Sequence, residues 1–153
     1  IKPLEKDKLE KALIKYLIKK EKTLQLKKIN VNDKNINVID VRMGLVRFNY
    51  NSELYVKCIQ KFLKYKNSHN EIVEFLRNNQ KDEAIRLAHS IKGIAANLSI
   101  DKLSKSAHNL KEKLSNESMD SSYEIKEFTE ILSYVIKKIE NKEVFQQISN
   151  RKI

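Results

Sequence analysis

Glycine, proline and cysteine are all scarce in this chain of 153 residues. It contains two glycines, one proline and a single cysteine, Cys58. Few glycines and prolines, together with many Leu, Ile, Lys and Glu residues, indicate an all-helical protein. A single cysteine excludes an internal disulfide. Cys58 shares a helical stripe with Tyr55, Ile59 and Phe62, so we expect it to be a small core residue.

Long apolar segments are absent as well. No run approaches the roughly 20 apolar residues that a membrane-spanning helix needs, and the sequence has no signal-peptide pattern. We therefore expect a chain that is not inserted in a membrane.

Acidic residues are outnumbered by basic ones. The chain has 31 lysines and arginines against 20 aspartates and glutamates, a formal net charge of +11. The lysines are spread along every expected helix with glutamates between them, as on a solvated surface. No run of basic residues is interleaved with aromatic residues, and no helix-turn-helix spacing is present. A basic nucleic-acid-binding helical protein is therefore the least favoured interpretation, and we expect no nucleic-acid partner.

Sites for ATP and for a metal ion are also missing from the sequence. The two glycines, Gly44 and Gly93, lie too far apart to form a glycine-rich phosphate loop. No cluster of carboxylates is suited to hold Mg²⁺. We expect no cofactor in this chain, and its status as an enzyme on its own stays open.

Apolar periodicity and capping residues predict a series of amphipathic helices. Their expected ranges are about 5–20, 41–48, 52–66, 69–78, 81–97 and 100–115, with a long last helix that begins at about 122 and whose continuation past Lys142 stays open. Ser52 is the expected N-cap of the helix at 52–66. Four of the helices are long and have short connections, which favours an antiparallel four-helix bundle with extra N-terminal helices.

The helix expected at 81–97 carries an unusual outer face. Its apolar stripe consists of Ala84, Leu87, Ala88, Ile91, Ile94, Ala95 and Leu98. His89 falls almost opposite this stripe, so we expect it to face solvent. Gly93 at i+4 and Ala96 at i+7 are too small to shield its ring, and Lys92 at i+3 can hold its ammonium near any group attached to that ring. A glycine inside a helix costs roughly 1 kcal/mol relative to alanine, which suggests that this surface is kept clear for another molecule.

Simpler interpretations exist for each of these residues. A lone histidine on a helix is usually an ordinary surface residue, and we assign His69 and His108 to that class. His89 differs because small residues, a cation and a long apolar stripe surround it. Ile85, at i−4, forms a small apolar docking patch with Gly93 and Ala96. The alternative is that Ile85 packs under a neighbouring helix.

The segment Ala88-His89-Ser90-Ile91-Lys92-Gly93 resembles the signature of histidine phosphotransfer (HPt) domains. The resemblance covers about residues 40–140. It extends upstream through Met43-Gly44-Leu45, Glu53-Leu54-Tyr55 and Phe62-Leu63, and downstream through Leu103, Ala107, Leu110 and Leu114. Two positions depart from the family. Ser99 stands where the family usually has glycine, so the turn there is expected to be less relaxed, and Lys111 stands where an acid is common.

The first residues carry a second resemblance. Lys2-Pro3-Leu4, followed by apolar residues at helical spacing, is similar to the end of a response-regulator receiver domain. We therefore expect the chain to be the C-terminal part of a hybrid sensor histidine kinase, in the cytoplasm, with a parent protein that can be membrane-anchored. The expected division is a receiver remnant at 1–22, a linker at 23–40, an HPt domain at 41–145 and a tail at 146–153.

The HPt resemblance implies a phosphorelay intermediate. In this hypothesis His89 accepts a phosphoryl group from a receiver-domain aspartate and passes it to another receiver. A neutral imidazole has a free lone pair for that attack, and Lys92 stabilises the anionic product. Mg²⁺ is expected in the partner receiver and the chain is expected to be monomeric. The alternative function is a helical adaptor or docking module that is not phosphorylated.

Overall fold

Helices account for every regular element in residues 38–116 and 120–151, the part of the chain that this computed structural model describes. They are α2 (Val41–Arg47), α3 (Ser52–Phe62), a 3₁₀ turn (Leu63–Tyr65), α4 (Ser68–Arg77), α5 (Lys81–Asn97), α6 (Asp101–Ser115), α7 (Ser122–Glu140) and α8 (Glu143–Asn150). The helix expected at 5–20, the receiver remnant at 1–22 and most of the linker at 23–40 lie outside the described residues.

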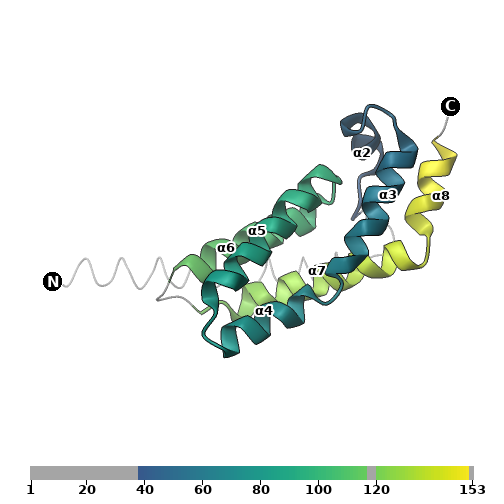
Figure 1. Ribbon diagram of the computed structural model, residues 1–153. Helices are drawn as coiled ribbons and strands as arrows, with labels where there is room; N and C mark the ends of the chain where they lie inside the picture. The colour runs from purple at the N-terminus through teal and green to yellow at the C-terminus, as the bar shows by residue number, and fades with distance from the viewer. Residues whose placement is uncertain (1–37, 117–119, 152–153) are drawn as a thin grey trace, which may run out of the picture. The chain divides into compact units, whose positions relative to one another are not determined.

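Helices α4, α5, α6 and α7 pack side by side as a bundle (Figure 1). α5 and α6 are antiparallel neighbours joined by the short turn 98–100, and α7 packs against α6 and α4. Each helix turns one apolar stripe inward because residues three and four positions apart share a face. The fully buried apolar residues of the bundle include Ile72, Ala84, Ala88, Ile91, Ala95, Leu103, Ala107, Leu110, Phe128, Leu132 and Val135. The expected all-α helical bundle is therefore confirmed.

A second group of helices, α2, α3 and α8, lies at the C-terminal end of α5, beside the turn 98–100 (Figure 1). α8 packs against both α2 and α3, and its Val144 and Ile148 are buried. Val38 and Ile39 are buried too, so the last residues of the expected linker are packed rather than free. This group holds the turn at the end of α5 in place.

The helix ends differ from the expected ones in two places. Asn51 caps α3, because its side-chain oxygen accepts a hydrogen bond from the backbone N–H of Leu54 at 3.1 Å, and Ser52 is already the first helical residue. The last long helix ends at Glu140, so it does not continue past Lys142. Lys142 has a φ of 66°, in the left-handed region, so the chain turns a corner there and α8 begins.

Three further expectations concern the C-terminal tail, the burial of Cys58 and the absence of a membrane-spanning helix. α8 runs across the expected boundary between the domain and the tail at 145/146, and Ile148 in it is buried. Cys58 is only half-buried, whereas its stripe neighbours Tyr55, Ile59 and Phe62 are fully buried. Cys58 therefore lies at the edge of the core. Within the described residues, no helix is long and apolar enough to cross a membrane.

Candidate functional site

The candidate site lies on the outer face of α5. The helix has the bounds expected from its periodicity. Asp82 and Glu83 lie in its first turn, where their negative charges interact favourably with the positive end of the helix dipole. Ala88 and Ile91 are fully buried, so they mark the inward face of the helix. His89 lies on the other face, and its ring is exposed. The structure thus presents His89 to solvent as expected, and its chemical role stays a prediction.

Gly93 lies one turn after His89 on the same exposed face. A Cβ atom added there would have no neighbour within 4 Å, and no glycine in the described chain has a positive φ. Neither packing nor backbone conformation requires a glycine at this position. It destabilises the helix by about 1 kcal/mol relative to alanine. What the glycine provides is an unobstructed surface beside the His89 ring.

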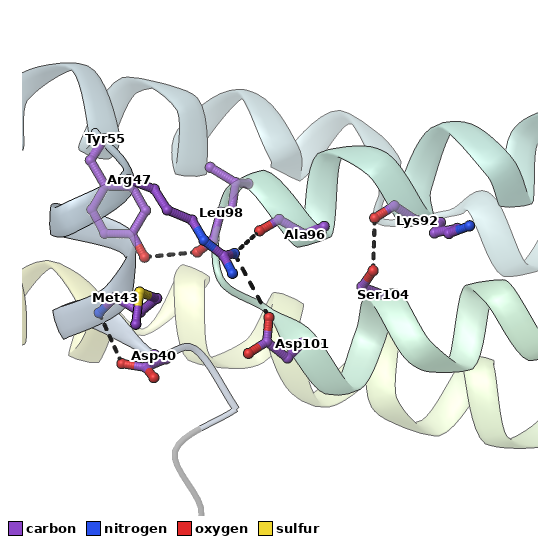
Figure 2. A network of polar contacts seen from close by, with 9 residues as sticks. All are labelled: Asp40, Met43, Arg47, Tyr55, Lys92, Ala96, Leu98, Asp101 and Ser104. Carbon is purple, nitrogen blue, oxygen red and sulfur yellow. Dashed lines mark hydrogen bonds and ion pairs between the residues drawn. The ribbon is translucent and has the colours of Figure 1, made fainter. Parts of the chain in front are cut away.

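Lys92 lies on the flank of α5 that faces α6. Its side chain is half-buried, and its backbone carbonyl accepts a hydrogen bond of 2.9 Å from the hydroxyl of Ser104 on α6 (Figure 2). The ammonium of Lys92 has no ion-pair partner among residues 38–116 and 120–151. It is therefore available to bind an anion that approaches this face.

Ile85 and Ala96, the other two expected docking residues, are both half-buried. They lie one turn before and two turns after His89, so Ile85, His89, Gly93 and Ala96 follow the i, i+4, i+8, i+11 spacing of one helix face. The structure brings the four residues together on that face. The partial burial of Ile85 leaves part of its side chain exposed and part covered.

The end of this face is fixed by residues that the sequence did not single out. Arg47 on α2 donates a hydrogen bond to the carbonyl of Ala96, and its guanidinium lies 3.9 Å from the carboxylate of Asp101 (Figure 2). Through Arg47, the last turn of α5 is tied to α2 and to the start of α6. No pattern in the sequence indicates this pairing, because the two partners are 49 residues apart.

Tyr55 and Asp40 hold the turn between α5 and α6. The Tyr55 hydroxyl donates a hydrogen bond of 2.8 Å to the carbonyl of Leu98, and the Asp40 backbone N–H donates one of 2.9 Å to the carbonyl of Ser99 (Figure 2 shows the first of these). Burial raises the pKa of Tyr55 well above its usual range, and the Asp40 carboxylate raises it further. Tyr55 thus keeps its proton and stays a hydrogen-bond donor at neutral pH.

Ser99 has a φ of 62°, in the left-handed region that glycine adopts freely. For other residues this conformation costs roughly 1–2 kcal/mol. Its hydroxyl is buried and has no hydrogen-bond partner among the described residues. The positive φ agrees with the expectation of a less relaxed turn at Ser99, and the hydrogen bonds from Tyr55 and Asp40 hold the chain in this conformation.

The other two histidines differ from His89 in their surroundings. His69 and His108 are half-buried, and the Nδ1 atom of each is buried with no hydrogen-bond partner within the described residues. Neither ring is presented on an open helix face as His89 is. In the same part of the chain, no three His, Cys, Asp or Glu side chains are gathered in a way that could hold a metal ion.

Comparison with known proteins gives one match. Residues 64–141 match the family model of the Hpt domain, a range that includes α4, α5, α6 and α7. The search of curated proteins found no match, and the search of solved structures found none.

Proposed function

The chain belongs to the Hpt domain family, and from this premise we propose that His89 accepts a phosphoryl group from a receiver-domain aspartate and passes it to another receiver. Membership of the family establishes the general activity, which is histidine phosphotransfer in a phosphorelay, and the general partner, which is a receiver domain. The residues and the donor and acceptor roles belong to the proposal.

The observation that carries the proposal is the open face around His89. The imidazole is exposed on a rigid helix, the neighbouring Gly93 leaves free space beside it, and the ammonium of Lys92 is unpaired among the described residues. A nucleophile, room for a partner and a cation for the product lie within one turn of each other. His69 and His108 have none of these surroundings.

The proposed step is an in-line transfer. A lone pair on an imidazole nitrogen of His89 attacks the phosphorus of the aspartyl phosphate, and the P–O bond breaks with its electron pair going to the aspartate carboxylate. The ring then carries a positive charge and releases its remaining N–H proton to solvent. The product has anionic phosphoryl oxygens, and Lys92 stabilises them as a mobile point charge. Transfer to the next receiver is the reverse of this step.

We assign the other requirements of the reaction to the partner. Ile85, Gly93 and Ala96 form the surface on which the receiver docks, with His89 among them. Mg²⁺ is bound by the receiver and not by this chain, and the chain acts as a monomer. We further propose that the chain is part of a hybrid sensor histidine kinase and becomes a phosphoprotein during signalling.

The decisive experiment is to incubate the chain with phosphorylated receiver domains from the same organism and to map the modified residue. We expect acid-labile, alkali-stable phosphate on His89. His89→Gln should abolish it and leave the helical circular dichroism signal and the melting temperature unchanged, because an exposed residue contributes little to packing.

Two matched variants serve as controls. His69→Gln and His108→Gln should both retain the label on His89. If the label persists in His89→Gln, or is lost in either control variant while the protein stays folded, the assignment is wrong. If receivers bind the chain and none phosphorylates it, the chain is an adaptor.

A further inference from the structure

The seam between α5 and α6 fixes how their side chains face one another. The hydroxyl of Ser104 donates a hydrogen bond to the carbonyl of Lys92, so Ser104 lies opposite Lys92 (Figure 2). The two helices run antiparallel, so each step back along α5 corresponds to one step forward along α6. His108, four residues after Ser104, thus lies opposite Ala88, and Lys111, seven residues after it, lies opposite Ile85.

Lys111 shares the flank of α6 that Ser104 occupies. Positions i, i+4 and i+7 follow one face of a helix, so the row Ser104, His108 and Lys111 runs along the seam. On α5 the matching row consists of Ile85, Ala88 and Lys92, and His89 follows Ala88 on the exposed side of that row. Lys111 is half-buried, as a residue on this flank should be.

The direction of the side chain brings Lys111 toward His89. Side chains on a helix lean toward its N-terminus. On α6 that direction points from the level of Ile85 toward the level of His89, four residues or about 6 Å along α5. A lysine side chain is long enough to cover that distance. Within the described ranges the ammonium of Lys111, like that of Lys92, has no ion-pair partner.

We propose that Lys111 is a second phosphoryl-binding residue, and that the ammonium groups of Lys92 and Lys111 approach the phosphoryl group on His89 from two different helices. This inference rests on the proposed function of His89. Lys92 reaches the group along α5 and Lys111 reaches it across the seam. No additional bond forms, and the two cations favour the doubly charged phosphoryl group over its protonated form.

The experiment measures that preference directly. The full chain is phosphorylated with phosphoramidate, a small donor that needs no receiver, and the ³¹P NMR signal of the phosphohistidine is followed between pH 5.5 and 9. A cation that lies about 6 Å from the phosphoryl group in a solvated setting lowers the pH at the midpoint of this titration by about 0.5 unit. Lys111→Gln should raise the midpoint by that amount, Lys92→Gln should do the same, and the double variant should raise it by about twice as much.

Matched variants separate this effect from a change in net charge. Lys105→Gln removes the same charge from the same helix at an exposed position, and it should leave the midpoint where it is in the unaltered chain. Lys111→Arg, which keeps the charge, should do so as well. If Lys111→Gln titrates like Lys105→Gln, Lys111 does not bind the phosphoryl group. If neither phosphoramidate nor a phosphorylated receiver labels His89, the proposed function fails first, and this inference fails with it.

Discussion

Gly44 and Gly93, the two glycines of the chain, lie inside helices for opposite reasons. Gly44 on α2 is buried, and a Cβ atom there would overlap the hydroxyl and the ring of Tyr55 on α3. Gly93 on α5 is exposed, and a Cβ atom there would meet nothing within 4 Å. The first glycine allows two helices to approach closely. Gly93 has no such role, because no other helix in the described chain approaches it.

This difference separates a structural feature from a functional one. Glycine weakens a helix by about the same amount at both positions. At Gly44 close packing offsets that loss, because Tyr55 lies directly over α2 and reaches the carbonyl of Leu98. At Gly93 no contact offsets it. Because the fold does not account for Gly93, the free space beside His89 is best explained by a partner that must come close.

The largest effect should follow from filling that space. Gly93→Leu should slow phosphoryl transfer from a receiver by about 100-fold, because a side chain beside His89 displaces the partner from its reacting position. Stability to urea should not fall, since leucine is a better helix former than glycine. Labelling by phosphoramidate should stay close to normal, because this donor is small. An unfolded Gly93→Leu protein, or one that a receiver phosphorylates at the normal rate, would contradict this explanation of Gly93.

Gly44→Ala should show the converse behaviour. A methyl group there overlaps Tyr55, so we expect a loss of about 1–3 kcal/mol in the free energy of unfolding, measured by urea denaturation. The folded fraction should still be phosphorylated on His89. In a Tyr55→Leu background the same substitution should cost less, because the hydroxyl oxygen and the two ring carbons that the new methyl group would overlap are all gone. Equal costs in both backgrounds would mean that Tyr55 is not the residue that requires glycine.

The core of the fold could be predicted from the sequence because its signals are local. The stripe on α5 repeats with helical spacing for the whole length of the helix, and the structure gives that helix the expected bounds, Lys81–Asn97. The exposure of His89 follows from the same geometry, since a residue opposite a buried stripe faces outward. The left-handed turn at Ser99 could be anticipated only from the resemblance to the family.

Helix ends were less predictable because neighbouring residues compete for the same role. Asn51 and Ser52 are both good N-caps, and in the structure Asn51 is the residue that caps α3. The end of α7 is marked in the sequence by a break in the apolar periodicity. The apolar stripe through Val135 and Ile139 resumes at Val144, one position out of phase, and the left-handed Lys142 absorbs that shift.

Contacts between distant segments could not be predicted. Arg47 meets the carbonyl of Ala96, and Tyr55 meets that of Leu98, across 49 and 43 residues of sequence. Backbone carbonyls are present at every residue, so nothing in the sequence marks these two as acceptors. Such contacts decide how firmly the end of the site is held, and they become visible only once the chain is folded.

Gly93→Ala should have the smallest effect and the most informative sign. A methyl group fits the open space, so the free energy of unfolding should rise by up to about 1 kcal/mol in urea denaturation. Receiver-dependent transfer should slow only slightly, far less than in Gly93→Leu, because a methyl group barely extends above the helix surface. Gly44→Ala is the matched control, since the same substitution at the other glycine should change stability in the opposite direction. If Gly93→Ala destabilises the protein, the face beside His89 is not open, and the contrast between the two glycines fails.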